Sequence, residues 1–424
     1  MEHGADMLDV YSLFLDTLAA QCGIKGGESI LICCSGGLDS MVLTYLMARV
    51  SPELGLRLGI LHVDHGIRGY ASKRDAMFVK DVSMRLSIPF FLEELNLGNN
   101  VTNLEEHARL ERYRAITRCM RDNKFRYAAT GHTMDDQAET LIFRLVRGSG
   151  LRGMEGIHFK REDGIIRPLL GLTREQISSY ARENNIDHVE DETNRDTHFA
   201  RNLIRHEVIP LIKRINPGVI TSTARFANVV REENQVLEAM AGELIKDAAE
   251  LDWGIIKVFN LEGILKRPPA VVKRFVIGVV SNLLAEARGI DSIQVGMIMD
   301  VVNGKRSAHN IKRLIRVTRW KNTVVFHAAG PRPFYTLEVQ APGDIYIKEI
   351  NRTLGVEFKD GEKGPVTIRS WLPGDMMEGR KVSQILYSMG VMSPLRQFWP
   401  VIVSREKVIG VAGMDSERAN MVFK

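Results

Sequence analysis

The chain has 424 residues, a hydrophobic content of 45% and a formal net charge of +5 at pH 7. That length suits about three domains, and so mild a charge does not by itself indicate a nucleic-acid-binding protein. The sequence has no apolar run of about 18 residues, and acidic residues interrupt its N-terminal segment, so we expect no membrane partner, no secretion signal and a cytoplasmic location.

The four cysteines, Cys22, Cys33, Cys34 and Cys119, form neither a CxxC pair nor a spacing with histidine that would suit zinc. We therefore expect reduced thiols. Cys33 and Cys34 belong to an apolar run that reads as a buried strand, so their expected role is packing rather than redox chemistry.

The stretch SILICCSGGLDS, residues 29–40, reads as a buried parallel strand that leads through a turn into the helical run MVLTYLMARV. Its two glycines let the backbone approach an anion, its serines add hydroxyl groups, and the N-terminus of the helix offers unpaired N–H groups. The turn therefore predicts a phosphate-binding loop made of Ser35, Gly36, Gly37, Leu38, Asp39 and Ser40.

Asp39 distinguishes this loop from a Walker A loop, which has a lysine within reach of the outer phosphates. A carboxylate beside phosphates repels them unless a divalent cation lies between the two, so Asp39 indicates Mg²⁺ held against a polyphosphate. The alternative is an ordinary glycine turn that serine and aspartate cap.

Strands and helices alternate along the first half of the chain. Helices are predicted at residues 9–20, 72–86 and 102–123, and strands at residues 29–34, 56–63, 88–92 and 127–130. This alternation is typical of an α/β fold with a doubly wound, mostly parallel sheet of the Rossmann type. Ligands bind such a sheet at the carboxyl ends of its strands, so His62, Asp64, His65 and Arg68 should face the same crevice as the loop.

Two helices carry charged residues that share a face. Arg109, Arg112 and Tyr113 lie three or four positions apart, and the alternative to a functional role is pairing of the arginines with Glu105, Glu106 or Glu111. In the later helix, which Asp135 can begin and Gly148 can end, Asp136 and Glu139 stand at positions i and i+3. The two carboxylates therefore lie on one face of this helix, and that face borders either a cleft or solvent.

Asn216-Pro217-Gly218 is the first plausible domain boundary, and it follows a basic helix in which Arg201 and Arg205 either contact phosphates or stay solvated. We predict a catalytic domain at residues 1–215, a mostly helical domain at 216–330 and a small α+β domain at 331–424. The helical domain should run through residues 219–251, 269–287 and 292–302 into a basic hairpin. That hairpin turns near Lys321-Asn322, and Trp320 beside it either stacks on a base or belongs to a charged edge strand.

The motifs SGGLDS, HVDHGIRG, EEHARLERY, GHTMDDQAETLIFRLVRGSGLRG, IIRPLL, EDETN and RNLIRHEVIP follow one another in this order. Together they resemble the tRNA(Ile)-lysidine synthetase branch of the PP-loop ATP pyrophosphatases, over residues 29–212. The resemblance implies ATP-dependent adenylation of the C2 oxygen of the wobble cytidine in a CAU anticodon. Attack by the side-chain amine of lysine and loss of AMP would then give lysidine.

Position by position, the resemblance implies that the loop and His62 bind ATP, that Asp39 binds the metal, that Asp136 and Glu139 bind lysine, and that Arg112 acts at the activated cytidine. In the last domain, WLPGDMMEGRKVSQIL resembles the tRNA-binding module of the longer family members. Met376 stands where that module has a basic residue, so Arg380, Lys381 and Arg396 are the expected tRNA contacts, beside Arg201 and Arg205.

Two other functions fit parts of the sequence. A tRNA sulfur transferase uses a related loop but needs reactive cysteines, for which the spacing here is wrong. A non-catalytic, ATP-gated tRNA-binding protein would have no use for three acids near the loop. The expected partners are tRNA(Ile) with a CAU anticodon and free lysine, and the sequence leaves a homodimer open.

Overall fold

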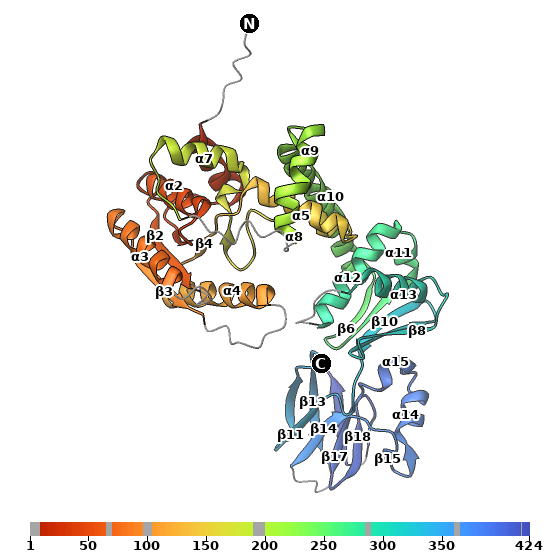
Figure 1. Cartoon of the computed structure of the whole chain (residues 1–424). Helices are drawn as coiled ribbons and strands as arrows, with labels where there is room; N and C mark the ends of the chain where they lie inside the picture. The colour runs from red at the N-terminus through yellow and green to blue at the C-terminus, as the bar shows by residue number, and fades with distance from the viewer. Residues whose placement is uncertain are drawn as a thin grey trace. The chain divides into compact units, whose positions relative to one another are not determined.

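The computed structural model describes residues 9–64, 70–95, 104–189, 200–284, 290–359, 365–416 and 418–424. The chain divides into two compact units, Met1–Asn234 and Gln235–Lys424 (Figure 1). The finer division into three domains at residues 215 and 330 stays a prediction. The predicted capping box at residues 102–105, His65, Arg68 and the EDETN motif lie outside the residues whose side chains are described.

The first unit contains a parallel sheet of five strands in the order β3-β2-β1-β4-β5. Ile30, Leu31 and Ile32 in the central strand are fully buried, as expected for a parallel strand that is covered on both faces. The predicted doubly wound α/β fold is confirmed. The strands are β1 (Ser29–Cys33), β2 (Arg57–Asp64), β3 (Phe90–Glu94), β4 (Tyr127–Ala129) and β5 (Ile165–Ile166).

Helices cover both faces of this sheet. Ile30 and Ile32 pack into one apolar core with α1 (Val10–Asp16), η1 (Thr17–Gln21), α2 (Leu38–Leu54), α3 (Tyr70–Arg85) and α7 (Arg174–Glu183). Leu31 and Leu61 pack into a second core with Ile116 and Cys119 of α4 (Leu104–Asp122), on the opposite side (Figure 1). The remaining helices of the unit follow β4: α5 (Met134–Val146), α6 (Leu151–Met154), η2 (Pro168–Gly171), α8 (Ala200–Leu203), η4 (Ile204–Val208), α9 (Ile209–Ile215) and the start of α10 (Val219–Asp247).

The strand order reverses direction between β1 and β4, which are neighbours in the sheet although β2 and β3 separate them in the chain. In an open α/β sheet this switch point forms the ligand crevice, at the carboxyl ends of the two strands. The loop after β1 is the predicted phosphate loop, and the loop after β4 leads to the two predicted acids on α5.

The second unit begins with an antiparallel sheet in the order β6-β7-β10-β9-β8, covered by α11 (Leu261–Leu265), α12 (Pro269–Leu284) and α13 (Ser292–Val302). The hairpin predicted around Lys321-Asn322 is confirmed, because Trp320 pairs with Thr323 across the turn. The helix predicted at residues 219–251 is too long. In the structure α10 ends at Asp247, and the next residues form β6, a strand that the sequence did not predict. The strands are β6 (Ala249–Trp253), β7 (Ile256–Asn260), β8 (Ala308–Ile311), β9 (Ile315–Trp320) and β10 (Thr323–Ala328).

The last part of the second unit contains a four-stranded sheet, β11-β14-β17-β18, and a three-stranded sheet, β12-β13-β19. Trp253 of β6 packs within 5.3 Å of Trp399 and 5.0 Å of Phe423, measured between ring centroids. The elements are β11 (Thr336–Val339), β12 (Gly343–Ile347), β13 (Arg352–Phe358), β14 (Val366–Ser370), β15 (Met376–Met377), β16 (Arg380–Lys381), α14 (Val382–Ser388), α15 (Ser393–Arg396), β17 (Pro400–Ser404), β18 (Lys407–Val411) and β19 (Ala419–Phe423).

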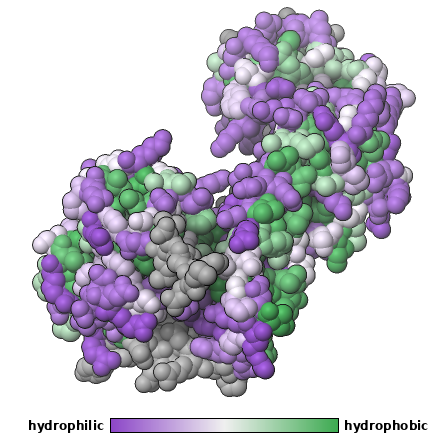
Figure 2. Space-filling view, turned by 90° about the horizontal axis from the view of Figure 1, so that it is seen from above, coloured by the Kyte–Doolittle hydropathy of each residue, from purple (hydrophilic) through white to green (hydrophobic). Residues whose placement is uncertain are grey.

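The surface is largely hydrophilic on the face that Figure 2 shows, with separate apolar patches. In the first unit, exposed apolar side chains include Leu211 and Ile215 of α9 and Phe226 and Val229 of α10. Across the described part of the chain, every helix is too short or too polar to cross a membrane.

Candidate active site

The phosphate loop joins β1 to α2 and is held by its own serines. Gly37 is the N-cap of α2, and Gly36 has a φ of 89°, a left-handed conformation that favours glycine. Ser40 Oγ accepts a hydrogen bond from the Ser35 N–H at 3.1 Å and donates one to the Gly37 carbonyl at 2.9 Å. The Ser40 hydroxyl, predicted to contact phosphate, thus also closes the loop.

The loop after β4 lies directly against the first turn of α2. A Cβ atom added to Gly131 would come within 3.2 Å of the Asp39 carbonyl carbon and of the Ser40 nitrogen. Only a glycine fits such a contact without displacing backbone. The loop after β1 and the loop after β4 therefore pack against each other, and side chains that follow either strand reach the same crevice.

Asp39 extends from the first turn of α2 with one oxygen in an ion pair and the other without a partner among the described residues. Asp39 Oδ2 lies 3.2 Å from Nη2 of Arg174, whereas Oδ1 is buried and accepts no hydrogen bond from any described residue. Burial raises the pKa of this carboxyl above its ordinary value, Arg174 opposes the shift, and Asp136 adds to it. A buried carboxylate oxygen without a partner is costly unless a ligand satisfies it.

A divalent cation fits the free oxygen of Asp39. Mg²⁺ is commonly held by one or two carboxylates together with substrate phosphates and water. The described residues include no group of three or more His, Cys, Asp or Glu side chains that could hold a metal by themselves. A cation at Asp39 would therefore take its other ligands from a bound polyphosphate.

Asp136 and Glu139 come together on a single guanidinium group. Glu139 Oε1 lies 2.5 Å from Nε of Arg205, and Asp136 Oδ1 lies 3.1 Å from its Nη2. The side chain of Glu139 is only 4% exposed. Burial raises the pKa of Glu139, Arg205 lowers it, and Asp136 raises it further. The fold therefore keeps two carboxylates close together in a site of low solvent access.

The helix that carries these acids begins earlier than the sequence indicated. Thr133, not Asp135, is the N-cap of α5, and it forms a capping box in which Asp136 Oδ2 accepts the Thr133 N–H at 2.8 Å. Asp135 instead accepts the backbone N–H of Arg174 at 2.7 Å, at the start of α7. The predicted helix end is confirmed, because Gly148 has a φ of 71° directly after the C-cap.

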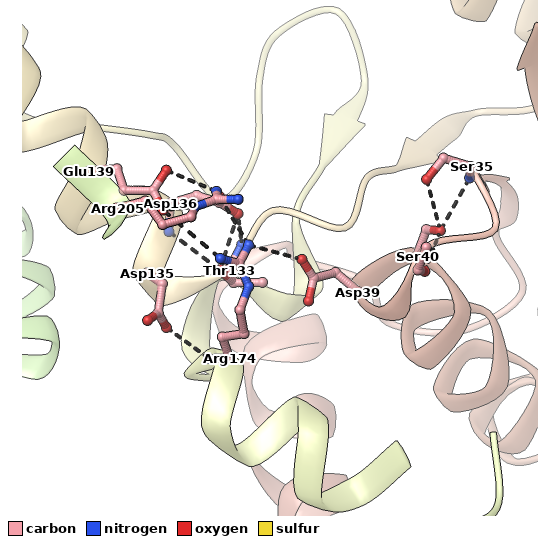
Figure 3. A network of polar contacts seen from close by, with 10 residues as sticks. Ser35, Asp39, Ser40, Thr133, Asp135, Asp136, Glu139, Arg174 and Arg205 are labelled. Atoms are coloured by element: carbon pink, nitrogen blue, oxygen red, sulfur yellow. Dashed lines mark hydrogen bonds and ion pairs between the residues drawn. The ribbon is translucent and has the colours of Figure 1, made fainter. Parts of the chain in front are cut away.

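Arg174 links Asp39 to the acidic pair. Its Nη2 lies 3.2 Å from Asp39 Oδ2 and 3.7 Å from Asp136 Oδ1, and its Nη1 lies 4.0 Å from Glu139 Oε1. Figure 3 shows Arg174 reaching Asp39 on one side and the acidic pair on the other, and Asp136 Oδ1 and Glu139 Oε1 are oxygens that Arg174 and Arg205 share. Sequence reasoning missed Arg174, because nothing near it in the chain suggests an acidic neighbour.

Arg205 was expected to contact tRNA, and the structure places it on both predicted lysine acids. Arg201, one turn earlier on α8, is exposed. Arg112 lies on α4, where desolvation lowers the pKa of its guanidinium and where the Cys33 thiol, at the carboxyl end of β1, is a neighbour. Among the glutamates considered as partners for Arg109 and Arg112, Glu111 pairs with Arg114.

Tyr113, next to Arg112, lies in a cluster of arginines. Arg161 and Arg109 stand 4.8 Å and 5.9 Å from the centre of its ring, and Nη2 of Arg167 lies 3.5 Å from its hydroxyl. Burial alone would raise the pKa of Tyr113, but Arg167 and the other arginines outweigh burial and lower it. The α4 side of the crevice is therefore strongly electropositive.

His62 contacts the backbone directly before the phosphate loop. Its side chain is buried, and Nδ1 lies 2.9 Å from the Cys34 carbonyl oxygen. Burial lowers the pKa of this imidazole, so it is neutral at physiological pH. The structure thus assigns His62 a contact with the loop backbone, and its predicted contact with ATP stays a prediction.

His132 is a further residue of the crevice that the sequence did not single out, although it follows β4 in the GHT motif. Its Nδ1 lies 3.0 Å from the Thr130 hydroxyl. Burial lowers its pKa to about 4, Asp136 opposes that shift, and Arg167, Arg109 and Arg201 add to it. The imidazole is therefore held neutral beside Asp136.

This neutral imidazole predicts a pH dependence of stability. The unfolded chain binds the His132 proton near the ordinary pKa of 6.5 and the folded chain only near about 4, so the unfolding free energy should fall as pH drops through that window. In His132→Asn the loss should be smaller. Denaturant titrations of both proteins across the window test this, and an identical pH dependence would contradict it.

The predicted tRNA contacts of the second unit surround a short hairpin. Arg380 and Lys381 form β16, are exposed, and pair with Met377 and Met376 of β15. A cation therefore stands directly opposite Met376. Arg396 is committed in part to the fold, because its Nε donates to the Val391 carbonyl at 2.7 Å.

Two other features of the second unit serve its own packing. Asp375 binds Arg369 through two oxygens, at 2.8 Å each, so the Gly-Asp part of the motif anchors the loop. Trp320 was expected either to stack on a base or to belong to a charged edge strand. The edge strand is wrong, because β9 lies between β10 and β8, and Trp320 packs against the core that contains Trp253.

Known proteins resemble this chain over most of its length. Residues 11–212 match the PP-loop domain family. The chain is similar to a protein of Symbiobacterium thermophilum named tRNA(Ile)-lysidine synthase, with 30% identity over 93% of this chain and 91% of the relative. Proteins with the same name from Clostridioides difficile (26% identity, 95% of this chain and 94% of the relative) and Chlorobaculum tepidum (33%, 67% and 89%) are also similar.

Proposed function

Because the chain belongs to the tRNA(Ile)-lysidine synthase family, we propose that it joins lysine to C2 of the wobble cytidine of tRNA(Ile), with ATP as the source of energy. The assignment of roles to residues rests on one cluster of charged side chains, which lies at the switch point of the parallel sheet. Asp39, with its unpartnered oxygen, shares Arg174 with Asp136 and Glu139. One crevice thus combines a phosphate loop, a metal carboxylate and a pair of acids suited to a cation.

In the first step, the C2 oxygen of the cytidine attacks the α-phosphorus of ATP, a bond to that oxygen forms, and pyrophosphate leaves. The loop from Ser35 to Ser40 holds the phosphates with its backbone N–H groups. Mg²⁺, when bound at Asp39, supplies positive charge that stabilises the pyrophosphate leaving group. We propose that Arg112, on the electropositive side of the crevice, stabilises charge on the adenylated cytidine.

In the second step, the amine of lysine attacks C2, the bond between C2 and the activated oxygen breaks, and AMP leaves. The lysine side chain has a pKa near about 10.4, so it arrives as an ammonium and must lose a proton before it attacks. Asp136 and Glu139 are suited to bind that cation. Burial raises the pKa of Glu139, which makes it a better proton acceptor than an exposed carboxylate.

The buried thiols count against sulfur transfer. Burial raises the pKa of Cys33 to about 12 and those of Cys22 and Cys119 to about 11. These groups stay protonated near neutral pH, and a protonated thiol is a poor nucleophile. A non-catalytic binding protein would also gain nothing from the buried acid Glu139 and the half-buried acid Asp136 beside a phosphate loop, since burial of an acid costs stability.

Incubation of the full chain with ATP, Mg²⁺, tRNA(Ile) and labelled lysine tests the proposed function. We expect label to enter the tRNA together with formation of AMP. A tRNA with uridine at the wobble position is the matched control, and it should stay unlabelled. ATP-dependent sulfur incorporation, or tRNA binding without AMP formation, would contradict the proposal.

The cations on β16 give a prediction for tRNA binding. Replacing both Arg380 and Lys381 by glutamine should weaken binding and lower the slope of log affinity against log salt, by roughly 0.7 to 0.9 for each phosphate that is no longer neutralised. Filter binding across a salt series measures that slope. Lys266→Gln, which removes a cation paired with Glu262 at 2.7 Å, is the control. An unchanged slope in the double variant would remove β16 from the tRNA interface.

A cytoplasmic location and a homodimer complete the proposal. The apolar side chains that α9 and α10 expose, Ile215 above all at 87%, favour an assembly with a second copy. Light scattering of the full chain decides between one and two copies.

A further inference from the structure

Arg205 occupies the place that the proposed function requires for the lysine ammonium. Its Nε lies 2.5 Å from Glu139 Oε1, and its Nη2 lies 2.9 Å from Glu139 Oε2 and 3.1 Å from Asp136 Oδ1. One guanidinium thus contacts three of the four carboxylate oxygens of the pair. The fourth, Asp136 Oδ2, accepts hydrogen bonds from the backbone N–H and the hydroxyl of Thr133.

A substrate ammonium and this guanidinium exclude each other. An ammonium within hydrogen-bonding distance of both acids would need the same oxygens, and it would lie a few ångströms from a second positive charge. That repulsion is strong at a site where the Glu139 side chain is only 4% exposed, because little water screens it. Lysine can therefore bind both acids only if Arg205 moves away.

The acids keep a counterion when Arg205 leaves. Arg174 remains at 3.7 Å from Asp136 Oδ1 and 4.0 Å from Glu139 Oε1, distances that match an ion pair of longer range (Figure 3). Asp39 Oδ2 holds Arg174 at 3.2 Å, and this ion pair does not depend on Arg205. A state without the Arg205 contact therefore leaves no buried carboxylate of this pair without a cation, which keeps its energy low.

The segment that carries Arg205 is suited to movement. Arg205 lies on η4, a five-residue π-helical segment between α8 and α9, and such turns are rare and occur often at functional sites. Arg201, one turn earlier, is exposed and carries the same charge. RNA phosphates that approach this helix would attract both arginines.

We propose that Arg205 holds the lysine-ammonium position in the free enzyme, and that tRNA withdraws it by offering phosphates in exchange. This proposal rests on the proposed function and adds to it the order in which tRNA and lysine bind. Lysine binds weakly to the free enzyme and more tightly after tRNA has bound, and the coupling between the two ligands is reciprocal. If the withdrawn state makes up about a tenth of the free enzyme, tRNA tightens lysine binding about tenfold.

Calorimetric titration of lysine into the full chain, with and without tRNA(Ile) and in the absence of ATP, tests this. In the wild type we expect binding about tenfold tighter with tRNA. Arg205→Gln should bind lysine about tenfold more tightly than the wild type without tRNA, and should lose most of the response to tRNA. Arg214→Gln, an exposed position on the next helix, should behave as the wild type does.

Lysine affinity that is unchanged or weaker in folded Arg205→Gln would overturn the proposal. If that variant melts below the assay temperature, Arg205→Lys keeps a counterion for Glu139 with a shorter reach, and it should show an intermediate affinity. An equal lysine affinity of the wild type with and without tRNA would also overturn it. These failures leave the proposed function intact if the wild type forms lysidine, whereas absence of lysidine would refute that function itself.

Discussion

Asp39→Asn should lower the rate of Mg²⁺-dependent AMP formation by at least about a hundredfold, the scale on which loss of one preorganised charge partner slows an enzyme. The amide has nearly the same shape as the carboxylate, so the fold should persist. It lacks the negative charge that would hold Mg²⁺, however, and the unpartnered Oδ1 of Asp39 is the site at which that charge is available. The variant should also lose the ion pair between Asp39 and Arg174.

This result is measured as AMP released in the presence of tRNA, across a Mg²⁺ titration, with tRNA binding measured in parallel. Binding of tRNA should stay close to that of the wild type, because Asp39 lies beside the phosphate loop and not on a basic surface. Glu175→Gln, an exposed acid in the first turn of α7, is the matched control and should keep normal turnover. A normal response of Asp39→Asn to Mg²⁺ would refute the metal site.

Asp136→Asn and Glu139→Gln should each raise the KM for lysine by about tenfold or more, or block transfer, while adenylated tRNA still forms and accumulates. Each variant removes one of the two negative charges that attract the ammonium, and such attraction is several times stronger in a partly buried site than in water. Glu139→Gln should have the larger effect, because its side chain is 4% exposed whereas that of Asp136 is 20% exposed.

Adenylated tRNA and lysine incorporation are measured side by side over a lysine titration. Asp135→Asn is the matched control, since this acid accepts the Arg174 backbone N–H, whereas the contacts of Arg205 go to Asp136 and Glu139. If both variants incorporated lysine with the KM and rate of the wild type, the acids would be structural partners of Arg205 and the lysine site would lie elsewhere.

Local sequence patterns were enough to select candidate residues for the site. Two glycines between a buried strand and a helix predicted the phosphate loop, and helical spacing placed Asp136 and Glu139 on one face, whereas their proposed role in lysine binding came from the family resemblance. The doubly wound sheet could also be anticipated, since alternating strands and helices have few packing solutions. These features depend on neighbours within a few positions in the chain.

The partners of the acids could not be predicted in this way. Arg174 contacts Asp39 across 135 positions of sequence, and Arg205 contacts Glu139 across 66. From the sequence alone, either arginine could equally be a solvated residue or an RNA-binding residue on the surface of its helix. The Thr133 cap was missed for a different reason, because Asp135 is an equally good cap by residue type and only the backbone decides between them.

The strand β6 shows how tertiary pairing overrides local preference. The segment AELDW continues the helical pattern of α10, yet it pairs with β7 and places Trp253 in a core with Trp399 and Phe423. Burial of a tryptophan against two aromatic rings outweighs the small helix propensities of a few residues.

Lysidine formation is tested most directly by the mass of the wobble nucleoside after tRNA(Ile) with a CAU anticodon has been incubated with the full chain, ATP, Mg²⁺ and lysine. We predict a nucleoside heavier than cytidine by the mass of lysine less one water, with one AMP formed for each nucleoside converted. That mass reports the new bond between nitrogen and C2 and the loss of the C2 oxygen. An unchanged cytidine, or a nucleoside that had gained sulfur instead, would contradict the proposed reaction.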